Sequence, residues 1–219
     1  WGRHTATFLL LGNVCTRRCG FCAVAKGVPA PLDGDEPRRV AEAAAALALR
    51  YAVLTSVTRD DLADGGARAF AETVRAIRRR LPDCLVEVLI PDFQGSEDAL
   101  RTVLEAGPAV VNHNIETVPR LYSLVRSGAD YERSLRLLAR CKESHSSIPA
   151  KSGLMVGLGE TDEEVVEVMR DLRGAGVSIL TIGQYLQPSR RHLPAQRYVG
   201  PGQFAYFGRL GLEMGFSHV

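Results

Sequence analysis

Three cysteines lie close together in the sequence, with the spacing C-x3-C-x2-C at Cys15, Cys19 and Cys22. Three thiolates on one short loop suit zinc or an iron–sulfur cluster, because both favour soft sulfur ligands. A structural zinc site needs a fourth protein ligand, for which His113 is the only plausible residue. A four-iron cluster held by three cysteines instead leaves one iron open to a substrate or cofactor. We therefore expect an iron–sulfur cluster on this loop.

The other two cysteines, Cys84 and Cys141, are isolated in the sequence. One begins a predicted strand and the other ends a predicted helix, so we expect both to be buried and inert. An odd number of cysteines in a chain long enough to bury its own core disfavours a disulfide scaffold and favours metal in a reducing compartment. Arg17 and Arg18, within the cysteine cluster, would offset the negative charge of a thiolate-bound cluster.

Composition excludes several classes of protein. The chain has 219 residues, of which 46% are hydrophobic and 24% charged, so a disordered protein is excluded. A net charge of +2, from 27 basic and 25 acidic residues, argues against nucleic-acid binding. No apolar run is long enough to span a membrane, and no signal peptide is visible, so we expect a cytoplasmic protein, with an organellar form left open. The chain begins at Trp1 without an initiator methionine, which suggests a trimmed fragment.

Apolar, β-prone runs alternate with helical patterns along the chain. The expected strands cover residues 5–11, 51–57, 85–90, 109–111, 152–156 and 177–182. The expected helices cover 37–49, 70–81, 99–105, 118–124, 131–141, 161–172 and 203–212. Six alternating units predict an α/β fold with a parallel sheet, either doubly wound or curved into a barrel, and periodicity does not separate the two. No linker divides the sequence, so we expect one domain over 1–219.

Two helices carry clear local signals. Phe70, Val74, Ile77 and Leu81 form an apolar stripe, and Thr161 with Glu164 forms a capping box. In the helix expected at 37–49, Val40, Ala44 and Leu47 should form one face.

Polar residues follow the predicted strands at their carboxyl ends, where ligands bind in parallel α/β folds. Together with two glycines of the fifth loop, Gly157 and Gly159, they are Thr55, Ser56, Arg59, Asp60, Asp61, Asp92, Gln94, Asn112, His113, Asn114, Glu116, Glu160, Gln184, Gln187, Ser189 and Arg190. Turns are commonly polar in any protein, but all six loops at this end of the strands agree. This favours a ligand-binding end of the fold that is polar and carries the three cysteines.

The cysteine motif after the first strand resembles the radical S-adenosylmethionine (SAM) superfamily. Further segments resemble its lipoyl synthase family, in the family's order: LTSVTRDDL at 54–62, DGG at 64–66, NHNIET at 112–117, KSGLMVGLGE at 151–160 and GQYLQPS at 183–189. The resemblance implies a partial (β/α)6, TIM-like barrel of parallel strands. It also implies a [4Fe-4S] cluster whose open iron binds SAM, and which cleaves SAM to methionine and a 5′-deoxyadenosyl radical.

The resemblance implies roles for particular residues. The cluster would be held by Cys15, Cys19 and Cys22. The SAM contacts would be Thr55 and Ser56 near the methionine amino group, Asn114 and Glu116 near the ribose, Arg126 at the carboxylate, Met155 beside the adenine, and Gln184 and Gln187 nearby. Glu160 could equally well contact the cofactor or brace the start of the next helix. Gly157 and Gly159 could simply permit a tight turn.

The family's activity is the insertion of sulfur at C6 and C8 of an octanoyl group on a carrier-protein lysine, which gives the lipoyl group. Its sulfur source is a second [4Fe-4S] cluster, held by a C-x4-C-x5-C triplet and by the serine of an Arg-Ser-Ser-Tyr segment. Neither segment occurs in 1–219, so we expect a core trimmed at both ends that retains the SAM-cleaving part. No side chain is expected to act as a catalytic acid or base.

The expected partners are octanoylated lipoyl-carrier proteins, iron–sulfur assembly or carrier proteins, and an electron donor, with neither nucleic acid nor membrane. Arg190, Arg191 and His192 could dock an acidic carrier or form a plain solvated loop. Asp60 and Asp61 are interpreted as loop-ordering or substrate-side residues. His113 is either a positioned active-site group or a hydrogen-bonded structural histidine. Two other functions stay open: another radical SAM sulfurtransferase, and a non-catalytic metal-binding or redox-sensing domain.

Overall fold

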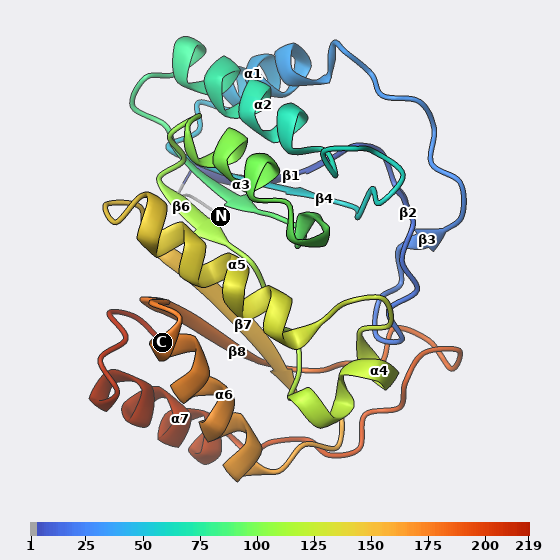
Figure 1. Ribbon diagram of the computed structural model, residues 1–219, viewed down its shortest axis with the longest axis vertical. Helices are drawn as coiled ribbons and strands as arrows, with labels where there is room; N and C mark the ends of the chain where they lie inside the picture. The colour runs from blue at the N-terminus through green and yellow to red at the C-terminus, as the bar shows by residue number, and fades with distance from the viewer. Residues whose placement is uncertain (1–3) are drawn as a thin grey trace. The chain divides into compact units, whose positions relative to one another are not determined.

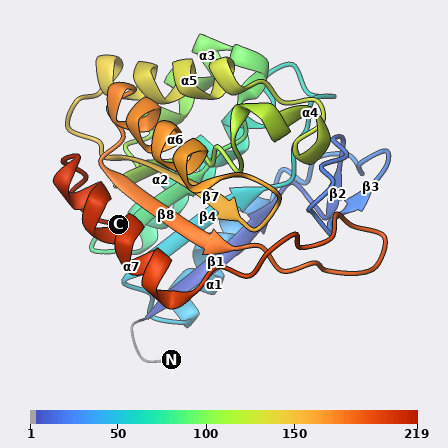
Figure 2. The ribbon, with the colours of Figure 1, turned by 90° about the horizontal axis from the view of Figure 1, so that it is seen from below.

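A computed structural model describes residues 4–219 (Figures 1 and 2). The chain divides into two compact units that interleave along the sequence. The first contains residues up to 16, 24–112 and 144–148, and the second contains 17–23, 113–143 and 149–219. The expectation of one domain stays a prediction. Within the described part of the chain, no helix combines the length and the apolar character needed to cross a bilayer.

The first unit is a parallel sheet with helices beside it. Its elements are β1 (Thr5–Leu10), β2 (Val14–Cys15), β3 (Ala25–Lys26), α1 (Glu36–Ala46), β4 (Tyr51–Ser56), α2 (Ala67–Arg80), β5 (Leu85–Leu89), η1 (Phe93–Gly95), α3 (Glu97–Leu104) and β6 (Val110–Asn112). The sheet order is β1-β4-β5-β6, with Thr5 level with Tyr51 and Tyr51 level with Leu85. Figure 1 shows α1, α2 and α3 together on one face of this sheet.

The apolar stripe of α2 packs as the sequence predicts at Phe70, Val74 and Ile77, which are fully buried. Leu81, the fourth predicted member, follows the last helical residue and is only half-buried. The first helix differs from its prediction. It ends at Ala46, and the chain turns through Ala48, whose φ is +47°, so Leu47 is 57% exposed and lies outside the core. Ala41 and Ala44 bury the inner face of α1 instead. The predicted role of Leu47 in that face is therefore wrong.

The second unit has its own core around two parallel strands. Its elements are η2 (Pro119–Leu121), α4 (Tyr122–Val125), α5 (Tyr131–Ser144), β7 (Ala150–Val156), α6 (Asp162–Gly174), β8 (Ile179–Gln184) and α7 (Pro201–Glu213). Lys151 of β7 is level with Ile179 of β8. Figure 2 shows these two strands side by side. Leu138 of α5, Met169 of α6 and Phe207 of α7 are buried in one cluster with the apolar side chains of these strands.

The capping box of α6 is confirmed. The Thr161 hydroxyl accepts a hydrogen bond from the Glu164 backbone N–H at 3.2 Å, and the Glu164 carboxylate accepts one from the Thr161 N–H at 2.8 Å. This pair fixes where the helix begins, directly after the polar turn that follows β7.

The predicted strands are found at β1, β4, β5, β6, β7 and β8, each starting within two residues of its predicted start. The predicted α/β fold of parallel strands is therefore confirmed.

Candidate active site

The cysteine loop is anchored separately in the two units. In the first unit, Cys15 lies in β2 opposite Lys26 of β3, and its carbonyl accepts a hydrogen bond from the Gly27 N–H at 3.3 Å. Thr16 donates from both its N–H and its hydroxyl to the Thr58 carbonyl, at 3.1 and 3.0 Å. These bonds tie the start of the loop to the segment that follows β4.

In the second unit, Cys19 and Cys22 flank a turn in which the Cys22 N–H donates to the Cys19 carbonyl at 3.3 Å. Gly20, between them, donates to the Val125 carbonyl at 2.9 Å and accepts from the Leu193 N–H at 3.1 Å. A Cβ at Gly20 would lie 3.0 Å from the Leu193 side chain and 3.1 Å from the Leu124 carbonyl. The close approach of these two segments therefore favours glycine at this position.

The donor set fits an iron–sulfur cluster. Cys15, Cys19 and Cys22 are half-buried thiols, and none of the five cysteines, all within the described residues, is in a disulfide. Among residues 4–219, no three histidine, cysteine, aspartate or glutamate side chains stand around a common metal position. The role of the three thiols as cluster ligands stays a prediction that rests on their chemistry and spacing. Arg17 is buried and Arg18 is exposed.

The end of β4 carries the two residues expected at the methionine end of SAM. Thr55 and Ser56 are half-buried and lie level with Leu9 and Leu10 of β1. The Ser56 hydroxyl oxygen is buried, and it has no hydrogen-bond partner among the described residues. Because a buried hydroxyl without a partner is costly, this oxygen is a suitable acceptor or donor for a bound polar group.

The segment after β4 is held by its own charged residues. The Arg59 guanidinium, 3% exposed, donates to both oxygens of Asp61 at 2.8 Å. That ion pair lowers the pKa of Asp61. The Asp60 N–H donates to the Thr16 hydroxyl at 3.1 Å, and its carbonyl accepts from the Gln94 amide at 3.2 Å. These contacts support the interpretation of Asp60 and Asp61 as residues that order the loop.

Arg126 is the centre of a hydrogen-bonded network in the second unit. Its Nη1 donates to the Tyr122 hydroxyl at 2.8 Å and to the Ser134 hydroxyl at 3.1 Å. Its Nη2 lies 3.4 Å from Nε2 of His113, and that ring nitrogen lies 3.0 Å from the Ser134 hydroxyl. His113 is fully buried and hydrogen-bonded, as expected of either an active-site group or a structural histidine, so its role stays a prediction.

Glu116 lies in the same part of the second unit. Burial raises the pKa of its carboxyl group, while the Arg126 charge and a hydrogen bond from Asn114 lower it, and burial has the larger effect. Its φ is +69°, in the left-handed region that residues with a Cβ rarely adopt. The Glu116 N–H donates to Gly153 at 3.0 Å and its carbonyl accepts from Met155 at 2.9 Å. This strained backbone position is therefore fixed by bonds to β7 on both sides.

The glycine of β7 makes room for the residues beside it. A Cβ at Gly153 would lie 2.6 Å from the Thr181 hydroxyl and 3.0 Å from the Asn114 side-chain oxygen. Met155, two residues further along the strand, is half-buried. The structure thus places Asn114, Glu116 and Met155 beside one another along β7, and their contact with SAM stays a prediction.

The turn after β7 is braced from within. The Glu160 carboxylate, 4% exposed as a residue, accepts from the N–H groups of Gly157 and Leu158 at 2.7 and 2.8 Å. Arg197 lies 3.3 Å from Glu160 and 2.6 Å from Asp162. These contacts favour the bracing role of Glu160 over a cofactor contact.

Gln184 and Gln187 make hydrogen bonds to the chain that follows them. The Gln184 amide nitrogen donates to the carbonyls of Tyr185 and Arg197, at 2.9 and 3.1 Å, and its oxygen accepts from the Val199 N–H at 2.8 Å. The Gln187 amide donates to the His192 carbonyl at 2.9 Å. Both side chains therefore shape the 185–199 segment, and their contact with a cofactor stays a prediction.

Comparison with known proteins shows which family the chain belongs to. The family model of the radical SAM superfamily matches residues 9–172. The lipoyl synthase of Rubrobacter xylanophilus is 61% identical over 219 residues, which cover 100% of this chain and 68% of that relative. The lipoyl synthase of Caldanaerobacter subterraneus is 59% identical, with 100% of this chain and 77% of the relative covered. The chain belongs to the lipoyl synthase family.

Solved structures show that this lipoyl synthase family member has the barrel fold that the resemblance implied. Methylornithine synthase matches with a TM-score of 0.74 at 14% identity, over 96% of this chain and 62% of that one. The enzyme SuiB, in its complex with SAM, matches with a TM-score of 0.77 at 10% identity, over 98% of this chain and 49% of that one. At these identities the likeness concerns the fold alone, a partial (β/α)6 barrel. Membership of the family implies a [4Fe-4S] cluster and SAM as cofactors.

Sequence reasoning missed the residues that support the family's site. Tyr122 precedes Arg126 by one helical turn, a spacing at which side chains meet, so this contact could have been found. Ser134 reaches the same guanidinium from the next helix, α5, and nothing in the local sequence signals that approach. Arg197 likewise reaches Glu160 across a long irregular segment.

Proposed function

We propose that the protein inserts sulfur at C6 and C8 of an octanoyl group on a lysine of a lipoyl-carrier protein, and that residues 4–219 hold the part that binds and cleaves SAM. The observation that carries the proposal is the cysteine loop, whose three half-buried thiols follow β1 and are anchored on both sides. Identity of 57–61% to lipoyl synthases over the whole chain supports it. The enzyme class is a radical SAM sulfurtransferase.

When bound, the cluster and SAM supply an electron and a 5′-deoxyadenosyl radical that abstracts hydrogen from the octanoyl carbons. The protein's own residues bind and orient the reactants. The thiolates of Cys15, Cys19 and Cys22 would hold three irons. The Ser56 hydroxyl and the Arg126 guanidinium would bind the amino and carboxylate groups of SAM, because each offers the complementary polar group.

The remaining predicted contacts would fix the nucleoside. Asn114 and Glu116 offer amide and carboxylate oxygens to the ribose hydroxyls, and Met155 offers an apolar surface beside the base. A hydrogen-atom abstraction needs no general base. Charged residues near the site, such as Asp61, are held in ion pairs and therefore serve to order the loops.

Three partners follow from this proposal: an octanoylated carrier protein, a protein that delivers iron–sulfur clusters, and an electron donor. The exposed turn with Arg190 and Arg191 would contact an acidic carrier. The Ser189 hydroxyl lies 2.9 Å from Nδ1 of His192 and accepts from the Arg191 N–H at 3.3 Å, which gives this turn a defined shape. A reducing compartment such as the cytoplasm suits a protein whose cysteines are thiols.

The test is anaerobic reconstitution of the chain with iron and sulfide, followed by SAM and a strong reductant, with 5′-deoxyadenosine measured by mass spectrometry. We expect the nucleoside from the wild-type chain and none from Cys19→Ala. Cys84→Ala is the matched control, because it removes a buried thiol outside the loop, and it should keep both bound iron and nucleoside formation. Iron bound without any nucleoside, or stoichiometric zinc in place of iron, would overturn the proposal.

A further inference from the structure

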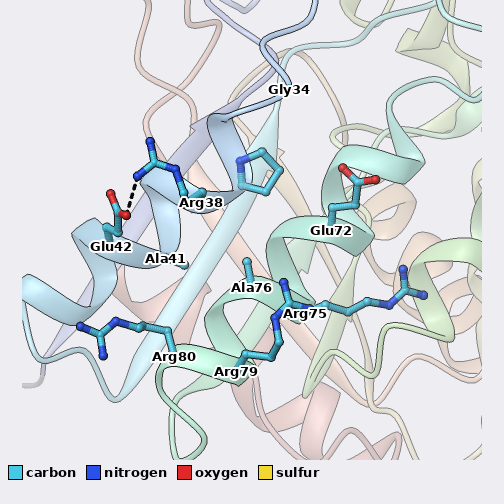
Figure 3. A pocket seen from close by; sticks show the side chains of 10 residues that line it. Gly34, Arg38, Ala41, Glu42, Glu72, Arg75, Ala76, Arg79 and Arg80 are labelled. Atoms are coloured by element: carbon cyan, nitrogen blue, oxygen red, sulfur yellow. Dashed lines mark hydrogen bonds and ion pairs between the residues drawn. The ribbon is translucent and has the colours of Figure 1, made fainter.

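A hollow of about 490 Å³ lies between α1 and α2 in the first unit (Figure 3). Its lining includes Ala41 of α1 and Ala76 of α2, which are 5% and 8% exposed. Because two small side chains face each other across the helix contact, the helices leave a groove there. Arg38, Arg75, Arg79 and Arg80 stand around it, as Figure 3 shows.

The carboxylates of this groove are already paired. Arg38 contacts Asp35 and Glu42, and Arg68 lies 3.0 Å from Glu72. No ion pair or hydrogen bond of the described residues involves the guanidinium groups of Arg75, Arg79 or Arg80. A second hollow of about 350 Å³ is lined by Arg75, Arg78, Arg79 and Pro82, so the positive surface continues past the end of α2. The groove therefore has an excess of cations that no carboxylate of this surface neutralises.

A role in helix stability explains only part of this cluster. Cations in the last turn of a helix stabilise it, because they face the negative end of the helix dipole. Arg78 has a further structural role, since it donates to the carbonyls of Ala106 and Gly107 just after α3. Arg75, however, lies before the last turn of α2 and lines both hollows. Neither the dipole nor a neighbouring carboxylate accounts for its position.

We propose that this groove binds an acidic segment of another protein. An apolar side chain of that segment would rest on the methyl groups of Ala41 and Ala76, and its carboxylates would pair with Arg75, Arg79 and Arg80. Arg75 and Arg79 are four residues apart on a helix, which is about 6 Å along the axis. Carboxylates four apart on a helix, or two apart in a strand at about 6.6 Å, match that separation.

The lining favours a protein over other anions. Alanine methyl groups offer no hydrogen-bond donor to a free phosphate, whereas they suit an apolar side chain. The carboxylates of Glu42 and Glu72 stand at the same groove, so the continuous phosphates of a nucleic acid would meet like charges. A mixed apolar and acidic surface avoids both problems, because its apolar group fills the floor and its carboxylates reach the arginines. The proposal does not depend on the sulfur-insertion chemistry.

The test is fluorescence anisotropy with the full 219-residue chain and a short fluorescein-labelled peptide of glutamates around a central leucine. We expect saturable binding that weakens with salt. Arg75→Glu combined with Arg79→Glu should weaken it about tenfold or more, because each reversal replaces an attraction with a repulsion. Arg101→Glu combined with Arg136→Glu is the matched control, since it changes net charge equally at exposed arginines of α3 and α5. It should leave affinity within about twofold.

Two further probes separate the alternatives. Serine in place of the central leucine of the peptide should weaken binding about threefold or more, because serine makes less apolar contact with Ala41 and Ala76. Equal loss in the control variant would mean general charge attraction and would overturn the proposal, as would no binding at all. Displacement of the peptide by millimolar inorganic phosphate, or tighter Arg75-dependent binding of a single-stranded oligonucleotide, would assign the groove to a different anion and also overturn it.

Discussion

Arg126 donates a hydrogen bond of 2.8 Å to the hydroxyl of Tyr122, which in turn donates to the Ile115 carbonyl at 2.9 Å. The shorter of the tyrosine's two donor contacts is to this carbonyl, since the Ser134 hydroxyl is 3.5 Å away, and the same hydroxyl accepts from the guanidinium. The ring is also stacked edge-on against Tyr131, with centroids 5.4 Å apart, which limits its rotation. Arg126 is in this way oriented by a side chain that is itself held in place.

Tyr122→Phe keeps the ring and removes this contact. We expect a loss of about 1 kcal/mol in unfolding free energy and a several-fold weaker affinity for SAM, because the guanidinium loses one of its fixed acceptors. The measurements are urea unfolding and equilibrium dialysis with SAM on the anaerobically reconstituted protein. Tyr131→Phe is the control, since its hydroxyl bonds Asp171 at 2.8 Å instead. Equal loss of SAM affinity in both variants would contradict the orienting role.

Ser56→Ala removes a buried hydroxyl that has no partner among the described residues. The unfolding free energy should stay unchanged or rise, because an unsatisfied polar group is removed, while affinity for SAM should fall about fivefold to tenfold. Ser152→Ala provides the opposite pattern, since the Ser152 hydroxyl accepts from the Ile115 N–H at 3.3 Å. That variant should lose about 1 kcal/mol of stability. A Ser56→Ala chain that binds SAM normally would remove Ser56 from the site.

Glu116→Gln should change the pH dependence of stability. Burial raises the pKa of Glu116 in the folded state, so the native protein binds more protons than the unfolded chain between the two pKa values. Stability therefore falls as pH rises through that interval, and glutamine avoids this loss. We expect the variant's Tm advantage to grow from pH 4.5 to pH 7.5, as scanning calorimetry would measure.

The control for this pH effect has the opposite sign. The Arg120 ion pair lowers the pKa of Glu164 to about 2, so the stabilising charge is fully present above the unfolded pKa and is lost as pH falls toward about 2. Glu164→Gln should therefore be the less stable chain at neutral pH, and its deficit should shrink as pH falls. A Glu116→Gln curve parallel to wild type would show that the carboxyl group is not perturbed.

Gly157→Ala and Gly159→Ala compare two glycines of the same turn with similar backbone conformations, at φ +102° and +111°. Both variants lose about 1 kcal/mol because alanine disfavours positive φ. At Gly157 the new Cβ would also lie 2.4 Å from the Gln184 amide nitrogen and 2.6 Å from the Arg197 carbonyl, whereas at Gly159 the nearest atom is at 3.6 Å. We expect a total loss of about 3 kcal/mol for Gly157→Ala in urea unfolding. Equal losses would mean that Gln184 and Arg197 can move aside to accommodate the new methyl group.

Most of the fold could be predicted because its signals are local. The stripe of Phe70, Val74 and Ile77 and the capping box at Thr161 each act within a few residues, and both are found as expected. The two short strands at Val14–Cys15 and Ala25–Lys26 could not be predicted, because two-residue strands have no periodicity. The prediction for Leu47 is wrong because the apolar periodicity runs past Ala46, where the helix ends.

The candidate site was predictable in part for the same reason. Motif residues such as Glu116 and Met155 come together because the segment that carries Glu116 is hydrogen-bonded alongside β7, through Gly153 and Met155. The support of Arg126 by Ser134 depends on how a helix packs eight residues later, which no spacing rule encodes. Gln184 shows the converse: a polar residue at a strand end that makes three hydrogen bonds to its own chain.

The burial of two cysteines has a practical consequence for measuring the other three. Burial raises the pKa of Cys141 to about 12 and raises the pKa of Cys84 above its ordinary value. Alkylating reagents attack thiolates, so these two positions are poorly labelled while the protein stays folded. The mass added by iodoacetamide to the native chain then counts only Cys15, Cys19 and Cys22. Intact-mass spectrometry thereby becomes a direct readout of metal loading, with full alkylation in denaturant as its internal reference.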